Sequence, residues 1–361
     1  MLAFPSRLSN PRRAMPVRTP SRRRAAAAPA QRPRLIDVAE AAGVSTMTVV
    51  RVLRDPAKVA ADTRARVERV LRKTGYTPDL VARGLASKRS GLIGAVVPLL
   101  TNSLIAEIMQ GLSDAIAVDG LHLVLGASGF SSAEEEALVR AFLSRRVDAL
   151  YLTGGIHTPA TVRMLKQAAI PVVEGGNLGT RPIDMMVGYS NVDAGREVTR
   201  YLLARSYAPV GYIGAHPTDN DRARDRRRGY ELALRDAGVR PERTLCVETT
   251  LDIDAGAHAM GALLERRPDV RGVFCSADAM AVGALFECQR RGLSIPSRIA
   301  IAGFDDVPIA RQVVPALTTL RVPRYEIGQR AGEMIRARLA KVAIAQAVVD
   351  TGFEFVPRDS A

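Results

Sequence analysis

The chain has 361 residues, more than one compact core usually holds, so we expect two or three domains. Its hydrophobic fraction of 47% is enough to bury them, and no apolar run approaches the roughly 18 residues that cross a membrane. The formal charge of +14 lies entirely before residue 91, because 31 acidic and 31 basic residues cancel after it. Such a distribution indicates that one end neutralises nucleic-acid phosphates.

The first 33 residues combine arginine, proline and alanine without the apolar core of a secretion signal. They predict a disordered basic arm, and two alternatives are a nonspecific DNA-binding tail and a segment upstream of the true start. Three cysteines without a CxxC pair, Cys246, Cys275 and Cys288, are typical of reduced thiols. We therefore expect a cytoplasmic protein, placed on the nucleoid when it is bound to DNA.

Residues 35–53, LIDVAEAAGVSTMTVVRVL, predict two short helices joined by a tight turn at Gly43. Each half carries one narrow apolar stripe, and Ser45 is a suitable N-cap for the second helix. Thr46, Met47 and Arg51 then lie on or beside the face opposite the stripe. This is helix-turn-helix geometry, in which the second helix enters the DNA major groove. The alternative is an ordinary helical hairpin with a solvated face.

Asp55-Pro56 ends the second helix. A third helix is predicted over residues 63–74, with Gly75 as its C-cap. Residues 79–87 follow as a short segment that carries Arg83 and Leu85, with Lys88 and Arg89 directly after it. It is too short for a stable isolated helix. It is either a hinge that orders on DNA and inserts Leu85 into the minor groove, or a plain linker.

From residue 91 the pattern changes to strands alternating with amphipathic helices. Strand-sized runs occur at residues 92–98, 121–127, 149–154 and 170–176, and a second set occurs at residues 210–215, 244–248, 272–276 and 299–306. This alternation predicts parallel sheets covered on both faces. Two doubly wound lobes leave a cleft at the carboxyl ends of their strands, where small ligands bind.

Residues 34 to about 358 resemble a LacI/GalR-family transcriptional regulator. The motifs that carry the resemblance are DVAEAAGVSTMTVVRVLRDP, TRARVERVLRKTGYTPDLVARGLAS, IPVV, RRRGYELAL, DAMAVGAL, GLSIPSRIAIAGFDD and LTTLRVP. Within the family, HTPATVRMLKQAAIPVVE, GVFCSADAMAVGALFECQRRGL and IAIAGF resemble the gluconate-utilisation repressor branch. The resemblance implies an all-α headpiece, a hinge helix, and an α/β core similar to a periplasmic sugar-binding protein.

For DNA, the resemblance implies recognition-helix residues, phosphate contacts and a hinge. The recognition helix would carry Ser45, Thr46, Met47, Thr48 and Arg51; phosphates would be met by Arg54, Lys58 and Thr63; the hinge would place Leu85 and Ala86 in the minor groove. Arg51 would pair with a guanine edge, whose O6 and N7 match a guanidinium. The chain departs from the family at Val50, usually Ser, and at Asp79, usually Asn.

For the effector, the resemblance points to the cleft-facing ends of several strands and helices. The implied contacts are Asn102, Ser103, Leu104, Arg226, Ser276, Asp278 and Asp305. His157, which lies near a strand end, and Glu174 are further candidates, although each histidine could instead be a surface or core residue. We expect Arg226 at the start of a helix, offering its donors to a carboxylate or to hydroxyls, and Asp305 accepting from sugar hydroxyls. Ala277 stands where the family commonly has Asn, and Gly175-Gly176-Asn177 replaces a bulkier ending.

The predicted boundaries are an arm at 1–33, a headpiece at 34–78, a hinge at 79–90 and a core at 91–358. The first lobe is expected to hold about 91–190 with a return segment near 318–333, and the second about 191–317 with 334–358. No leucine heptad follows residue 358, and in this family such an extension makes tetramers. We therefore predict a homodimer on a palindromic operator.

Two other classes of protein were weighed. An enzyme is not favoured, because the four histidines are scattered and no HExxH, GxSxG, Walker loop or paired Cys/His metal spacing is present. No cofactor or metal is expected. A sugar-binding protein without DNA-binding function needs only the core, and the basic headpiece argues against it. The effector prediction is a sugar acid such as gluconate or a ketogluconate, with a neutral sugar as the alternative.

Overall fold

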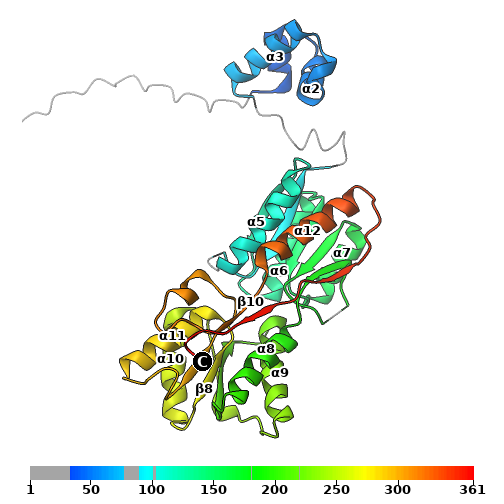
Figure 1. Ribbon diagram of the computed structural model, residues 1–361. Helices are drawn as coiled ribbons and strands as arrows, with labels where there is room; N and C mark the ends of the chain where they lie inside the picture. The colour runs from blue at the N-terminus through cyan, green and yellow to red at the C-terminus, as the bar shows by residue number, and fades with distance from the viewer. Residues whose placement is uncertain (1–32, 77–88, 101–102, 180, 219) are drawn as a thin grey trace, which may run out of the picture. The chain divides into compact units, whose positions relative to one another are not determined.

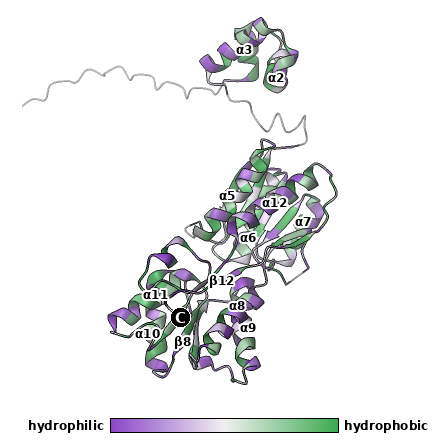
Figure 2. Ribbon diagram, viewed as in Figure 1, coloured by the Kyte–Doolittle hydropathy of each residue, from purple (hydrophilic) through white to green (hydrophobic). Residues whose placement is uncertain are grey.

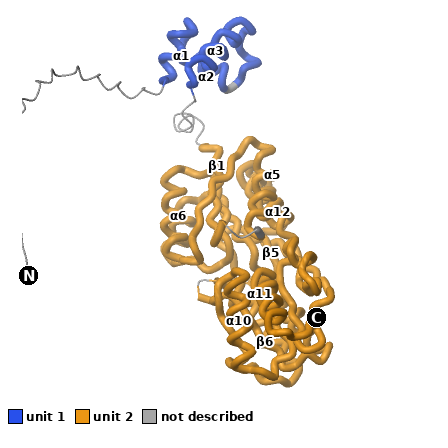
Figure 3. Tube along the Cα trace, turned by 90° about the vertical axis from the view of Figure 1, so that its left-hand side faces the viewer, with its two compact units in different colours: residues 1–82 blue, residues 83–361 orange. Residues whose placement is uncertain are grey.

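The computed structural model describes residues 33–76, 89–100, 103–179, 181–218 and 220–361. The chain divides into two compact units, one up to Ala82 and one from Arg83 onward (Figure 3). Each unit is described by itself. The predicted hinge up to residue 88 and the predicted basic arm up to residue 32 lie outside the described residues.

The first unit contains three α-helices. They are α1 (Leu35–Ala42), α2 (Thr46–Arg54) and α3 (Ala61–Thr74), with a 3-10 turn at Pro56–Lys58. Gly43 ends α1 at a φ of 64°, which L side chains rarely adopt, so the predicted turn is formed as expected. Ser45 caps α2 by accepting the Thr48 backbone N–H at 3.2 Å.

The predicted apolar stripes form the core of this unit. Its buried members are Val38, Ala39, Ala42, Val49, Val52 and Val67. Because each helix contributes one narrow stripe, the opposite face of α2 stays in solvent.

The second unit is built from two lobes, each with a parallel sheet. The first sheet has the order β11-β5-β4-β3-β1-β2. Its strands are β1 (Leu92–Val97), β2 (His122–Ala127), β3 (Ala149–Thr153), β4 (Val172–Gly175), β5 (Met185–Gly188) and β11 (Val348–Asp350). Its helices are α5 (Ser103–Ala117), α6 (Ser132–Ser144), α7 (Pro159–Ala168) and α12 (Arg324–Leu339).

The second lobe has the sheet order β7-β6-β8-β9, also parallel. Its strands are β6 (Val210–Ala215), β7 (Cys246–Thr249), β8 (Gly272–Cys275) and β9 (Ala300–Ala302). Its helices are α8 (Asn191–Ala204), α9 (Asp221–Asp236), α10 (Ile253–Arg266) and α11 (Asp278–Arg290), with 3-10 turns at Arg243–Leu245 and Pro308–Arg311. Apolar strands lie inside both lobes and polar helix faces lie outside (Figure 2).

The closing segment of the chain differs from its predicted division. Residues 334–358 were expected in the second lobe, but α12 packs along α5 (Figure 1) and β11 pairs with β5, so residues 324–350 complete the first lobe. Only the stretch after β11 returns, through β12 (Glu354–Val356), which pairs with β10 (Thr319–Arg321). The reason is that the apolar face of α12 covers the first sheet, a pairing that sequence order alone does not reveal.

Three helix pairs approach each other through glycines. In the α8–α9 pair, a Cβ on Gly195 would lie 2.3 Å from the Arg226 carbonyl oxygen, and one on Gly229 would lie 2.1 Å from the Val192 carbonyl oxygen. Reciprocal contacts of the same kind join α5 to α12 and α10 to α11. Because only glycine permits such close backbones, the α8–α9 crossing fixes the height of Arg226 above the sheet.

None of the helices in the described part of the chain is both long and apolar enough to cross a bilayer.

Candidate functional site

The exposed face of α2 carries the predicted recognition residues. Ser45, Thr46, Met47 and Arg51 are exposed, and the Met47 side chain has 65% of its surface in solvent. An exposed methionine at a helix start gains no folding energy there, which leaves this face available for a partner.

The predicted phosphate contacts lie around the same helix. Lys58 is exposed and forms a surface ion pair with Asp55 at 3.6 Å, and Thr63 is half-buried. The side chain of Arg54, and all of Leu85 and Ala86, lie outside the described residues.

A cavity of about 270 Å³ lies in the second unit and is lined from both lobes. The first lobe contributes α5, the end of β3 and the loops that follow β1, β2 and β4, while the second contributes α9 and the loops that follow β8 and β9. The cavity therefore sits at the carboxyl ends of both sheets, where the alternating pattern predicted a cleft. We call it the effector cleft.

Four predicted effector residues line this cleft. They are Leu104, Arg226, Ser276 and Asp305. Asn102 lies outside the described residues, and so does the side chain of Ser103. The charged side chains in the described lining are Arg222, Arg226 and Asp305, and Arg222 is paired with Asp221.

Arg226 is buried and held on three sides. Its Nε donates to Asn191 Oδ1 at 2.8 Å, its Nη1 to the Ser276 carbonyl oxygen at 2.7 Å and its Nη2 to the Tyr189 hydroxyl at 3.1 Å. Its guanidinium also lies 3.8 Å from the centre of the Phe304 ring. A guanidinium has five N–H donors, so this rigid group retains two for a ligand.

The expected place of Arg226 at a helix start is wrong. Helix α9 begins five residues earlier, at Asp221, because Asn220 Oδ1 accepts the Ala223 backbone N–H and caps the helix there. The earlier start brings Arg222 onto the same helix, one turn before Arg226, and both reach the cleft.

Asp305 presents a buried oxygen without a partner. Among the described residues, no hydrogen bond reaches its Oδ1, and the residue has a φ of 114°, in the region that favours glycine. Burial raises the pKa of Asp305 to about 6, although Arg226 and Arg324 act in the opposite direction. A strained backbone that exposes an unsatisfied acceptor to a cleft is an arrangement suited to a hydroxyl donor from a ligand.

Asp278 does not line the cleft, contrary to expectation. Its Oδ1 accepts the Thr319 hydroxyl at 2.6 Å and its Oδ2 accepts the Val307 backbone N–H at 2.8 Å. Burial, and then the charge of Asp305, raise the pKa of Asp278 to about 8. This carboxyl therefore fixes the loop that carries Asp305 instead of facing a ligand.

His157 and Glu174 also lie away from the cleft lining. His157 Nδ1 is 2.6 Å from Glu135 Oε1, and its Nε2 is 3.2 Å from Glu174 Oε1. Burial lowers the pKa of His157, but the two glutamates outweigh it and raise the pKa to about 9. Both ring nitrogens are thus engaged inside the first lobe, and neither His157 nor Glu174 is part of the cleft lining.

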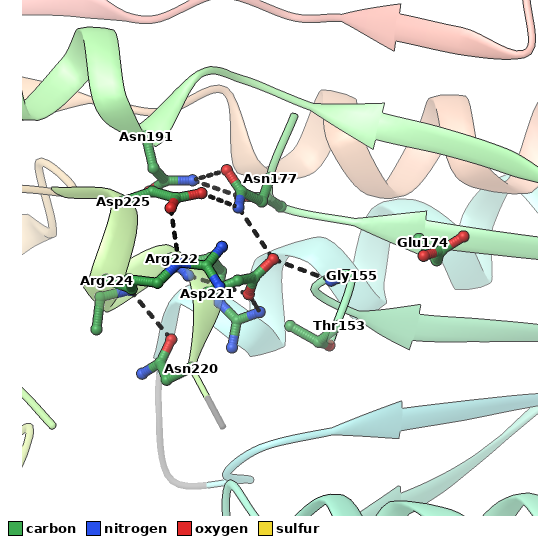
Figure 4. Close-up of polar contacts among 12 residues, drawn as sticks. Thr153, Gly155, Glu174, Asn177, Asn191, Asn220, Asp221, Arg222, Arg224 and Asp225 are labelled. Carbon is green, nitrogen blue, oxygen red and sulfur yellow. Dashed lines mark hydrogen bonds and ion pairs between the residues drawn. The ribbon is translucent and has the colours of Figure 1, made fainter. Parts of the chain in front are cut away.

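The sequence analysis missed a polar network at the junction of the lobes. Asn177 Nδ2 donates to Asp221 Oδ2 at 2.9 Å and to Asp225 Oδ2 at 2.8 Å, and its Oδ1 accepts from Asn191 at 2.9 Å. Figure 4 shows Asp221 between Gly155 of the first lobe and Arg222 of its own helix. Burial would raise the pKa of Asp221, but Arg222 and these hydrogen bonds lower it. The sequence feature that could have indicated this network is the Asn220-Asp221 pair, which is typical of a helix N-terminus.

The departures from the family pattern have local structural reasons. A Cβ on Gly175 would lie 2.0 Å from the Tyr151 hydroxyl oxygen, so the tyrosine leaves no space for a side chain at position 175. Gly176, at a φ of 90°, lines the cleft and leaves it open beside Arg222. Ala277 also lines the cleft, so its short side chain enlarges the space where an Asn would reach inward.

An exposed helix-turn-helix face joined to a two-lobed core with a cleft between its lobes is the arrangement of a DNA-binding regulator. Residues 34–79 match the family described as bacterial regulatory proteins, lacI family, and residues 199–361 match the periplasmic binding protein-like domain.

Relatives and a solved structure agree with these matches. The chain is 34% identical to the HTH-type transcriptional regulator GntR of Escherichia coli strain K12, over 91% of this chain and 99% of that protein. It is 36% identical to GntR of Pseudomonas aeruginosa, over 91% and 96%. A LacI-family transcriptional regulator from Silicibacter pomeroyi superposes with a TM-score of 0.84 at 33% identity, over 91% and 99%. The chain belongs to the LacI family of transcriptional regulators and is not an enzyme.

Proposed function

We propose that this regulator is a repressor that binds a palindromic operator as a homodimer and releases it when a sugar acid occupies the effector cleft. The observation that carries the effector is the unpartnered Asp305 oxygen, which lines the same cavity as Arg222 and Arg226. A carboxylate acceptor and guanidinium donors together match a ligand that has both hydroxyls and anionic oxygens.

The donors that Arg226 retains favour an acid over a neutral sugar. Arg222 is already paired with Asp221, so Arg226 and Asp305 are the charged groups left to meet a ligand among the described residues, and burial disfavours the anionic form of Asp305. Arg226 retains donors for a ligand carboxylate, and Asp305 accepts from hydroxyls. The resemblance of three segments to the gluconate-utilisation branch supports gluconate or a ketogluconate as the effector, with a neutral sugar as the alternative.

On the DNA side, α2 supplies the sequence-reading surface. Arg51 would pair with guanine O6 and N7, while Thr46 and Met47 would select the half-site and Ser45 and Thr48 would support its start. Arg54, Lys58 and Thr63 would meet phosphates, which adds affinity without sequence information. Leu85 and Ala86 would form the minor-groove wedge of the hinge.

The headpiece reads one half-site, so a palindromic operator requires two copies of the chain. We propose that effector binding shifts the two lobes and thereby changes how the two hinge segments pair. The ligand needs only a differential affinity for the two arrangements of the lobes. Because its target is operator DNA, we place the protein in the cytoplasm.

Calorimetric titration of the protein tests the effector. Gluconate, 2-ketogluconate, ribose and galactose are the probes, and we expect micromolar binding of one sugar acid that weakens at least about tenfold in Arg226→Ala. Arg228→Ala, which removes an exposed arginine two residues away, is the matched control and should bind as the wild type does. Binding of a neutral sugar alone would reject the acid while leaving the regulator in place.

Removing the Arg51 guanidinium tests the recognition helix. We expect Arg51→Ala to lose specific affinity by about 1–3 kcal/mol while nonspecific DNA binding persists, because a bidentate base contact carries discrimination. Competition between a DNA site selected from random duplexes and unrelated DNA, at fixed salt, measures this ratio. An unchanged ratio in the variant would show that α2 is not the reading helix.

A further inference from the structure

A small polar chamber adjoins the effector cleft. Phe130, Thr153 and Arg222 line both cavities, so the chamber and the cleft share a wall. Its volume of about 20 Å³ is close to that of one water molecule or one hydroxyl group. A group of that size at the end of a cleft ligand is therefore the largest that it admits without rearrangement.

Two carboxylates line this chamber from opposite lobes. Glu135 comes from the first turn of α6, and Asp221 from the first turn of α9. Asp221 is engaged by Arg222, Gly155 and Asn177. Glu135 uses Oε1 toward His157, and no hydrogen bond to its Oε2 is present within the described part of the chain. Glu135 thus offers a free acceptor to whatever enters.

The Glu135 carboxylate is held in place from behind. His157 lies between Glu135 and Glu174, and the side chains of these three residues are 9%, 2% and 2% exposed in the order Glu135, His157, Glu174. Glu174 is in turn fixed by the Ile183 backbone N–H, which donates to its Oε2. One histidine lies between two carboxylates, so it cannot offset the charge of both.

Serine hydroxyls complete the chamber wall. Ser128, Ser131 and Ser132 line it at the start of α6. Hydroxyls can donate or accept, so they match a polar group of a ligand in either role. Arg222 also lines the chamber, but it is paired with Asp221 at 2.9 Å, so Glu135 is the charged group left to meet a ligand, and a neutral hydroxyl fits the wall better than an anion does.

We propose that Glu135 is a specificity-determining residue of the effector site, which accepts a hydrogen bond from the terminal hydroxyl of an open-chain polyhydroxy monoacid and excludes a second carboxylate. The inference rests on the proposed sugar-acid effector. The ligand carboxylate lies toward Arg226, and the neutral end of the chain enters the chamber. A diacid of the same length would bring its second carboxylate against Glu135, where burial strengthens the repulsion.

The test compares two probes that differ at one end of the same six-carbon chain. D-gluconate ends in a hydroxymethyl group and D-glucarate ends in a carboxylate. We expect calorimetric titration of the full chain to favour gluconate by at least about tenfold, and Glu135→Gln to reduce that preference by about tenfold because the repulsion is removed. Glu134→Gln changes the same charge on the exposed neighbour and should leave the preference unchanged.

A second variant tests the chamber without touching the buried ionic group. Ser132→Val adds methyl groups to a space that holds one hydroxyl, so gluconate should bind at least about tenfold more weakly while the melting temperature stays within a few degrees. If the wild type binds gluconate and both variants keep its affinity and preference, the chamber holds water only and the inference is overturned, while the sugar-acid effector stands. If the wild type binds neither acid, the proposed effector fails and the inference fails with it.

Discussion

At the scale of single residues, the features of the cleft that matter for a ligand are polar atoms without a hydrogen-bond partner among the described residues. Arg226 has fixed geometry with two spare donors, and Asp305 has a buried acceptor that no described residue meets. Leaving a buried polar atom unpaired costs about 1–3 kcal/mol, a cost that a ligand can remove. A ligand that donates a hydrogen bond to Asp305 would therefore gain part of its binding free energy at this position.

The raised pKa of Asp305 predicts a pH-dependent effector affinity. The ionised form accepts hydroxyl hydrogen bonds, so binding favours deprotonation and affinity rises as the pH increases through about 6. Asp278, whose pKa is about 8, stays protonated in this window, and Arg226, whose pKa is raised, stays charged. Affinity should increase about tenfold from pH 5 to pH 7 and then level off.

Calorimetric titration of gluconate across that pH range measures the effect. Asp305→Asn cannot ionise and should bind weakly with no pH dependence between pH 5 and 7. A flat profile in the wild type would show that Asp305 does not accept from the effector.

Motifs in the sequence located Arg226, Ser276 and Asp305, because each stands beside a recognisable run of residues. They did not locate Arg222, Asn177 or Glu135, whose roles depend on contacts between segments far apart in the chain. They also assigned His157, Glu174 and Asp278 to the ligand, because nearness to a strand end does not reveal whether a side chain already has partners.

At the scale of elements, glycines set how closely helices pack. The reciprocal contacts of Gly195 and Gly229 bring α8 and α9 together, and Asn191 and Arg226 stand on these two helices.

The sequence predicted strands and helices where apolar periodicity was strong, including the three headpiece helices. Its strand-sized runs did not include β5, whose apolar run is only a few residues long.

Adding one methyl group at the α8–α9 crossing should separate the helices. We expect Gly229→Ala to lower the free energy of unfolding by about 1–3 kcal/mol, because its Cβ would overlap a backbone carbonyl, and to weaken effector binding by displacing Arg226. Urea unfolding and calorimetric titration measure the two effects.

Gly261→Ala is the matched control for this prediction. Its Cβ would meet only the ends of the Arg291 and Glu287 side chains, which can move. Replacing a helical glycine by alanine then leaves stability unchanged or raises it by up to about 1 kcal/mol. Equal losses in both variants would indicate that the close crossing does not position the site.

At the scale of the whole molecule, the two units differ in both charge and fold. The excess positive charge lies ahead of residue 91, and the core after it is neutral overall. Composition therefore indicated the two-part organisation before any element was assigned. The division of the lobes was harder to predict, because α12 and β11 join the first lobe after the chain has already built the second.

The central claim is that occupancy of the effector cleft changes operator affinity. The most direct measurement is fluorescence anisotropy of a labelled DNA duplex, selected from random sequences by this protein, titrated at fixed salt with and without gluconate. We expect gluconate to weaken DNA binding at least about fivefold in the wild type and to have no effect in Arg226→Ala. Unchanged DNA affinity in a wild-type protein that calorimetry shows to be saturated with gluconate would contradict the claim.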